Sequence, residues 1–187
     1  MDLPVSRRTF VAGLAGTVGG IWLTAHARSV LAAGEHVARR TATGQQTFRV
    51  LTLADALEIE AAAAQIIPSD GTHGAREARV VHFIDRALET FASADKNDFI
   101  SLAAELRTRA AAAGARSFAA LPDRQQIQLL QQMEKDSKDH FERLRSTTIV
   151  GMFANPSYGG NYEKGGWKLL GFTDRFSWAA PFGSYDK

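Results

Sequence analysis

The 187-residue chain contains no cysteine. Without thiols it can form no disulfide, no thiolate zinc site, no iron–sulfur ligation and no covalent attachment of a c-type haem. An excess of one charge is also missing, because 22 basic side chains are balanced by 20 acidic ones and the two signs are interspersed. With no Lys/Arg stripe to follow a phosphate backbone, we expect no nucleic acid partner.

Motifs for cofactor binding or nucleophilic catalysis are missing as well. A dinucleotide fingerprint needs Gly-x-Gly-x-x-Gly between a strand and a helix, and the only dense glycine spacing before the C-terminal region lies at residues 13–20. No nucleophile elbow occurs. We therefore expect no catalytic, cofactor-binding or metal-binding residues, so that another chain carries any redox chemistry.

The N-terminus has the pattern of a twin-arginine export signal, in which a paired arginine precedes an apolar run over residues 11–23. Such a run of about 13 residues is shorter than the roughly 20 that span a bilayer. Residues 1–33 are predicted to be a signal peptide that leads to the periplasm, with a short uncleaved anchor as the alternative. Small residues at 25–27 or 31–33 fit a processing site. The residues that define the signal are Ser6, Arg7, Arg8 and Phe10.

After a polar linker or extended arm at 34–47, residues 48–187 are predicted to form one all-α domain. Apolar residues recur at helical spacing, and no segment alternates at period two for long enough to be a strand. We expect an irregular bundle of about five helices. The first begins at a capping box formed by Thr52 and Asp55. Its apolar face is expected to hold Leu53, Leu57, Ala61, Ala64 and Ile67. The predicted helices span about 52–67, 75–91, 95–113, 122–136 and 137–153.

The composition changes over residues 154–187, where glycines and aromatic side chains crowd together and regular helix is not expected. This tail cannot form a core alone. It either wraps back over the bundle or lies in an interface, where aromatic anchors are favoured. Glycines in its first turn suit positive φ. The candidate partner-interface residues are Tyr158, Gly159, Gly160, Asn161, Trp167 and Trp178.

Two histidine–carboxylate pairs have helical spacing. His82 with Asp85, and Asp136 with His140, could each offer two ligands to a metal. A di-iron bundle would need repeated Glu-x-x-His elements, which do not occur. A histidine bonded to a carboxylate on the helix surface is the ordinary explanation.

Several short motifs follow one another after residue 51, and together they resemble the gluconate 2-dehydrogenase subunit 3 family. Their order and spacing carry the resemblance, because each motif alone is short. They are Ile66-Ile67-Pro68-x-Asp70, Gly74-Ala75-x-Glu77-Ala78, Val81-x-Phe83-Ile84-Asp85, Phe118-x-x-Leu121, Phe153-x-x-Pro156-x-Tyr158-Gly159-Gly160-Asn161, Gly166-Trp167 and Gly171.

The resemblance implies a non-catalytic small subunit of a flavin-dependent sugar or sugar-acid dehydrogenase. In such complexes a large subunit binds FAD and transfers hydride, and a multihaem cytochrome c subunit passes electrons on. The small subunit carries the signal for the twin-arginine translocase and assists export of the large one. Two alternatives remain at this point. One is a free-standing periplasmic helical module that binds a small ligand; the other is an enzyme that uses His82 or His140 with a metal.

Overall fold

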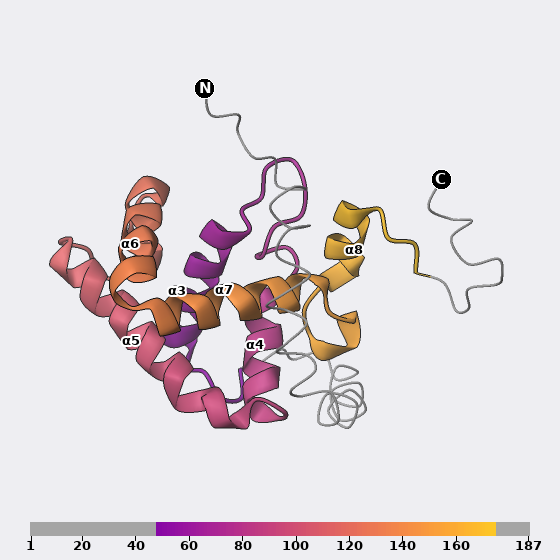
Figure 1. The fold of residues 1–187 in the computed structure, drawn as a ribbon, viewed down its shortest axis with the longest axis horizontal. Coiled ribbons are helices and arrows are strands. Elements are labelled where there is room, and N and C mark those ends of the chain that lie inside the picture. The colour runs from indigo at the N-terminus through magenta and orange to yellow at the C-terminus, as the bar shows by residue number, and fades with distance from the viewer. Residues whose placement is uncertain (1–47, 175–187) are drawn as a thin grey trace.

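The computed structural model describes residues 48–174, and these residues are all-α (Figure 1). The export-signal residues Ser6, Arg7, Arg8 and Phe10, the linker 34–47 and Trp178 lie outside the described residues. The predicted fold class is confirmed. The helices are α3 (Leu53–Ile66), α4 (Val80–Glu89), α5 (Lys96–Ala112), α6 (Asp123–Asp136), α7 (Lys138–Phe153) and α8 (Gly165–Leu170). The short 3-10 turns are η1 (Ser93–Asp95), η2 (Phe118–Ala120), η3 (Pro156–Tyr158) and η4 (Tyr162–Lys164).

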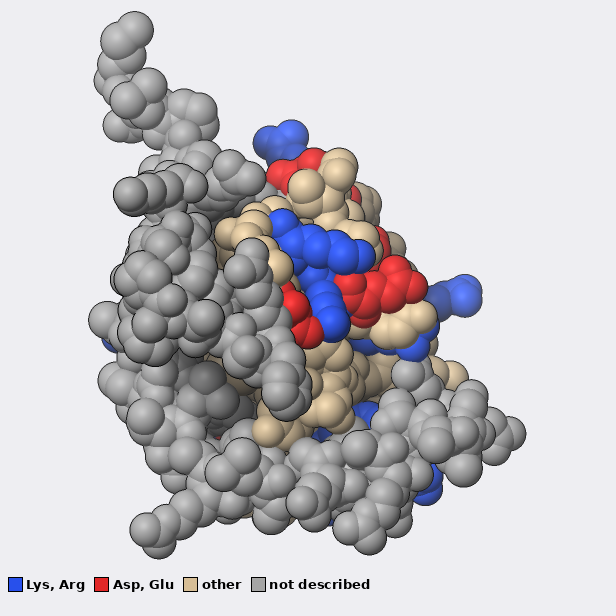
Figure 2. Space-filling model, turned by 90° about the vertical axis from the view of Figure 1, so that its right-hand side faces the viewer, with Lys and Arg blue, Asp and Glu red and all other residues tan. Residues whose placement is uncertain are grey.

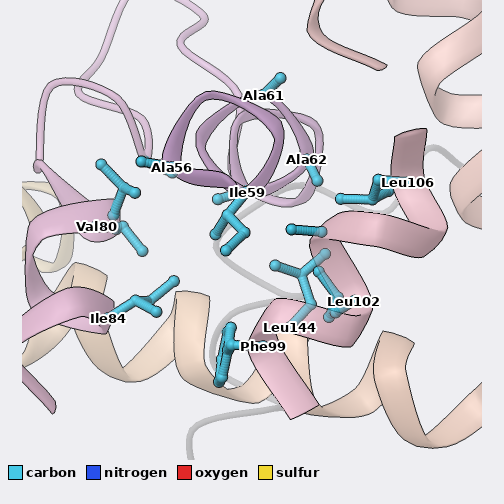
Figure 3. Packing of buried hydrophobic residues seen from close by; sticks show 14 of the residues in the cluster. Ala56, Ile59, Ala61, Ala62, Val80, Ile84, Phe99, Leu102, Leu106 and Leu144 are labelled. Atoms are coloured by element: carbon cyan, nitrogen blue, oxygen red, sulfur yellow. The ribbon is translucent and has the colours of Figure 1, made fainter. Parts of the chain in front are cut away.

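Helix α7 is the central element, because it contacts each of the other five helices and runs through the middle of the domain (Figure 1). Small residues allow this close approach. A Cβ atom at Gly151 would lie 2.9 Å from Cδ1 of Phe83, so α4 packs directly on the α7 backbone. Buried side chains of α3, α4, α5 and α7 pack together between these helices (Figure 3). The largest of them include Ile59, Phe83, Ile84, Phe99, Leu102, Leu106, Leu144 and Met152.

The predicted apolar face of α3 is confirmed at Ala61, Ala64 and Ile67, which are buried, but it is wrong at Leu53 and Leu57. Leu53 and Leu57 are 67% and 49% exposed, whereas Ile59 is completely buried among alanines. The reason is that two carboxylates on the inner side have specific partners. Asp55 pairs with Arg107 at 2.8 Å, and Glu58 accepts a hydrogen bond from the backbone N–H of Ala119 at 3.0 Å. The buried alanines are Ala56, Ala61, Ala62, Ala63 and Ala64.

The ends of the first two helices also test the sequence patterns. The predicted cap of α3 is confirmed, because the Thr52 hydroxyl accepts from the Asp55 N–H at 3.1 Å. Helix α4 begins at Val80 and not near residue 75. Arg79 adopts a left-handed φ of 54°, which breaks the helix before Val80.

The first described residues are held by a buried carboxylate on α4. Asp85 is 3% exposed and accepts hydrogen bonds from three successive backbone N–H groups, those of Arg49, Val50 and Leu51, at 2.7 to 2.9 Å. Close to this carboxylate in the sequence, the ring of His82 stacks on that of Phe48, with centroids 5.0 Å apart. Residues 48–51 are therefore fixed to α4. No helix among the described residues is long and apolar enough to cross a membrane.

Candidate functional site

The C-terminal segment, defined here as residues 155–172, is bonded to the end of α7. Asn161 lies at its centre with none of its surface exposed and with a left-handed φ of 45°. Its N–H donates to the Gly151 carbonyl at 2.9 Å, and its side-chain Nδ2 donates to the Ala154 carbonyl at 2.8 Å. Its Oδ1 accepts from the Gly166 N–H at 2.9 Å. One residue thus joins the end of α7 to the start of α8.

These contacts satisfy a need that α7 creates. The last carbonyl groups of any helix lack partners within the helix. Besides the carbonyl groups of Gly151 and Ala154 that Asn161 uses, the carbonyl of Phe153 accepts from Nε1 of Trp167 at 2.8 Å. The C-terminal segment therefore caps the C-terminal end of α7. These hydrogen bonds hold the segment in a defined conformation on the helix end.

Two glycines are required for the same junction. A Cβ atom at Gly160 would lie 2.3 Å from the Gly151 oxygen, and one at Gly166 would lie 2.0 Å from the Met152 oxygen. No side chain fits at either distance. Positive φ was predicted for both glycines of the turn: Gly159 has a φ of +100°, which L-residues rarely adopt, but Gly160 has no positive φ and is required by the close approach alone. The glycines predicted to form a turn thus allow backbone to approach backbone.

The structure corrects two expectations for this part of the chain. Residues 155–172 are not without regular structure, because they contain η3, η4 and the six-residue helix α8. Gly160 and Asn161 are buried, so in this conformation their atoms are not available to a partner. Tyr158 is half-buried against the core. Trp167 is half-buried as well, with its ring edge-on to Phe172 at 5.2 Å. Trp178 lies outside the described residues.

Exposed side chains that sequence reasoning did not single out surround this junction. Tyr162, Leu170 and Phe172 are 39%, 52% and 46% exposed. The Arg79 guanidinium lies 3.5 Å from the Tyr162 ring centroid, a cation–π contact. Hydropathy alone could not have separated these residues from the buried aromatic ones. Which aromatic and apolar side chains are exposed depends on which residues cap α7, and the fold alone determines that.

The two predicted histidine–carboxylate pairs have other partners in the fold. Asp85 holds the backbone of residues 49–51, while the His82 ring stacks on Phe48. Burial lowers the pKa of His82, and the nearby charges of Arg79 and Arg86 lower it further. Within residues 48–174, no three His, Asp or Glu side chains converge as metal ligands.

His140 joins α7 to α5 through Glu105 and not through Asp136. Its Nδ1 lies 2.5 Å from Oε2 of Glu105, and Arg109 bonds both Glu105 and Asp136, at 2.6 and 2.7 Å. Burial would raise the pKa of Glu105. Hydrogen bonds from His140, Ser137 and Arg109, together with the Arg109 charge, outweigh burial and lower it. This network is a structural tie between helices.

A groove lies at the other end of the domain, between α3, α6 and α7, with a volume of about 280 Å³. Its walls combine apolar side chains with an amide and charged rim. None of the described residues of the glycine- and aromatic-rich tail, 154–174, lines it. The lining residues are Gln65, Ile66, Ile127, Leu130, Gln131, Glu134, Phe141 and Arg145.

The described residues thus define an all-α domain whose specific polar contacts hold helices and a C-terminal cap together. A family model described as gluconate 2-dehydrogenase subunit 3 matches residues 54–174, well over half of the chain. The chain belongs to this family, as the order of its motifs predicted. The description of the family indicates a subunit of a multisubunit dehydrogenase. No curated protein and no solved structure is matched.

We predict opposite tolerance at two glycines of the C-terminal segment. Gly166→Ala should lower the free energy of unfolding by about 2 to 4 kcal/mol, because its Cβ would overlap the Met152 oxygen. Gly171→Ala should cost only about 1 kcal/mol, because its φ is +69° but no atom lies within 4 Å of its Cβ. Urea unfolding followed by circular dichroism measures both. Equal losses would contradict the packing described for Gly166.

We also predict a pH dependence that originates at Glu105. A carboxylate whose folded-state pKa is lowered stabilises the fold above its ordinary value, here 4.5, and the contribution is lost as pH falls through the folded-state pKa. Glu105→Gln should therefore be less stable than the wild type at pH 7 by about 1 kcal/mol or more. The difference should shrink as pH falls below the ordinary value. Urea midpoints between neutral and acidic pH test this.

The control for this titration is Glu134→Gln, which changes an exposed side chain. It should stay within about 0.5 kcal/mol of the wild type throughout. A Glu105→Gln deficit that remains constant down to the lowest pH would show that the Glu105 charge does not support the fold.

Proposed function

We propose that this chain is the non-catalytic small subunit of a flavin-dependent sugar or sugar-acid dehydrogenase that is exported to the periplasm. The family match over residues 54–174 carries the proposal. In this proposal a large subunit holds FAD and oxidises the substrate, and a multihaem cytochrome c subunit takes the electrons. The small subunit binds the large one and stabilises it.

The residues present agree with a small subunit that leaves the binding of FAD to the large one. A flavin dinucleotide needs glycines that let the backbone approach its pyrophosphate. Two glycines of the C-terminal segment instead lie against the backbone of this chain, because a Cβ atom at Gly166 or Gly160 would lie only 2.0 or 2.3 Å from a carbonyl oxygen. They leave no cradle for a phosphate. Their packing supports a partner as the holder of FAD.

The export signal supports the same arrangement. The twin-arginine pathway carries proteins that fold before they cross, and Ser6, Arg7, Arg8 and Phe10 fit its signal. A signal on this chain would serve a folded flavoprotein bound to it. The small subunit then supplies the export signal, and the large subunit supplies FAD and oxidises the substrate.

One observation favours a second candidate, the periplasmic module that binds a small ligand. The groove between α3, α6 and α7 has apolar walls and about 280 Å³ of space. Ligand sites usually enclose about 300 to 1,000 Å³ and bury most of the ligand. Ile127 in the wall is 42% exposed, so the groove is open to solvent. The dehydrogenase subunit accounts for more of the chain.

We predict that tagged full-length protein, purified from its native host, brings down a larger protein that contains FAD. Flavin fluorescence after denaturation and peptide mass spectrometry identify that protein. As a control, changing both arginines of the signal, Arg7 and Arg8, to lysine should leave the complex intact but retain it in the cytoplasm. A stable monomer without any flavoprotein would contradict the proposed function. A raised unfolding temperature with sugars or organic acids would favour the second candidate.

A further inference from the structure

The first four described residues, 48–51, are called here the entry segment, and one carboxylate on α4 holds their backbone. Both oxygens of Asp85 take part. Its Oδ2 accepts from the N–H of Arg49 at 2.7 Å, and its Oδ1 accepts from the N–H groups of Val50 and Leu51 at 2.9 Å. Hydrogen bonds to an ionised acceptor are about twice as strong as those between neutral groups. The attachment of the entry segment therefore depends on whether this carboxylate is available to accept them.

A titratable ring on the same helix also contacts the entry segment. His82 stacks on Phe48, with the ring centroids 5.0 Å apart and an angle of 10° between the ring planes. The imidazole is half-buried. It lies three residues before Asp85, which is a spacing at which side chains on a helix meet. The histidine and the carboxylate that the sequence pattern pairs thus both hold the entry segment.

The surroundings of the His82 ring oppose its protonation. Burial is the largest cause that lowers the pKa of His82, and the charges of Arg79 and Arg86 lower it further. Only the charge of Asp85 acts in the opposite direction and raises it. On the entry segment the one charged side chain is that of Arg49, which is exposed. The neutral imidazole is therefore the form that fits between α4 and the entry segment.

Both arginines near this ring have contacts of their own that fix them. The Arg79 guanidinium lies 3.5 Å from the ring centroid of Tyr162. The Arg86 side chain lies against Gly159, where a Cβ atom would be only 2.5 Å from its Cδ. On the face of the molecule shown in Figure 2, basic side chains lie next to acidic ones, whereas two basic side chains act together on His82. A proton on His82 would add a third positive charge beside them.

The Asp85 carboxylate is also a suitable partner for a protonated His82. An imidazolium ring donates hydrogen bonds from both nitrogens, and a carboxylate three residues further along a helix is within its reach. A bond from His82 to Asp85 would compete with the three N–H groups of the entry segment for the same two oxygens. Histidine is the side chain that ordinarily changes its charge between about pH 5 and pH 8, so we expect this competition in that range.

We propose that His82 and Asp85 form an acid-sensitive latch, in which neutral His82 leaves the carboxylate to the entry segment and protonated His82 bonds the carboxylate and releases residues 48–51. A protonated histidine that biases a two-state contact is a known form of pH switch. Because the pKa of His82 is lowered while the segment is attached, the latch holds fully above the ordinary value of 6.5 and weakens as pH falls below it. The latch acts within this chain and does not depend on the proposed function.

Amide hydrogen exchange in the full-length chain, followed by NMR, tests the latch. Protection of the N–H groups of residues 49–51, corrected for the intrinsic exchange rate, should fall by about threefold to tenfold from about pH 7.5 to about pH 5.5. About tenfold is the upper limit, because a released ring with the ordinary pKa of 6.5 is about 90% protonated at the lower pH. Protection of the buried Leu106 N–H on α5 should stay within about twofold, since the release is local. His82→Phe keeps an aromatic ring against Phe48 but cannot be protonated, so it should abolish the fall.

Four other results would overturn the latch. Protection at residues 49–51 that does not change with pH would show that no switch exists. Protection that rises on acidification would show that a protonated His82 binds the Phe48 ring more tightly, as cations do on aromatic faces. A fall that persists in His82→Phe would assign the titration to another group. An equal fall at Leu106 would show that the whole domain unfolds.

A measurement on the wild type alone keeps the test decisive if His82→Phe does not fold. The ring signals of His82 are followed by NMR over the same pH range as the exchange. The latch predicts that these signals shift over the same interval in which residues 49–51 lose protection. A ring that titrates over a different interval would overturn it.

Discussion

The buried amide of Asn161 is the interaction on which the arrangement of the C-terminal region depends. A helix that ends inside a protein leaves carbonyl groups that need donors, and α7 ends against the core that its own residues build. Asn161 supplies donors from its backbone and side chain and accepts one bond from α8. Because its φ of 45° is tolerated by asparagine better than by most residues, one residue type meets both requirements. The position of α8 against the end of α7 follows from that junction.

The sequence predicts the all-α fold and the three long helices α5, α6 and α7 well, because their apolar residues recur over many turns. It fails where partners distant in sequence decide the outcome. On α3, Asp55 and Glu58 turn inward because Arg107 and the backbone at Ala119 receive them, and this exposes Leu53 and Leu57. Helix α8 was missed because two glycines at its start normally disfavour a helix. Here they are required by close contact with α7.

The residues predicted from the sequence to contact a partner differ in their exposure. Tyr158 and Trp167 are half-buried, whereas Gly160 and Asn161 are interior parts of the cap of α7. The exposed residues lie just beyond them. Sequence patterns also paired each histidine with a carboxylate three or four residues away, whereas the fold pairs His140 with Glu105 on α5. In both cases a contact between residues distant in the sequence decided the outcome, and the local sequence pattern did not predict it.

Together these features describe how the described part of this dehydrogenase-subunit domain is held together. Its charged side chains tie helices to one another, and two of its glycines bring backbone segments into contact. The most direct test is the stability of an Asn161→Ala variant, measured by urea unfolding followed by circular dichroism. Because the variant loses the buried side-chain bonds to the Ala154 carbonyl and the Gly166 N–H, the account predicts a loss of about 2 to 4 kcal/mol in the free energy of unfolding, whereas the exposed Asn97→Ala should lose less than about 1 kcal/mol. An Asn161→Ala variant as stable as Asn97→Ala would contradict it.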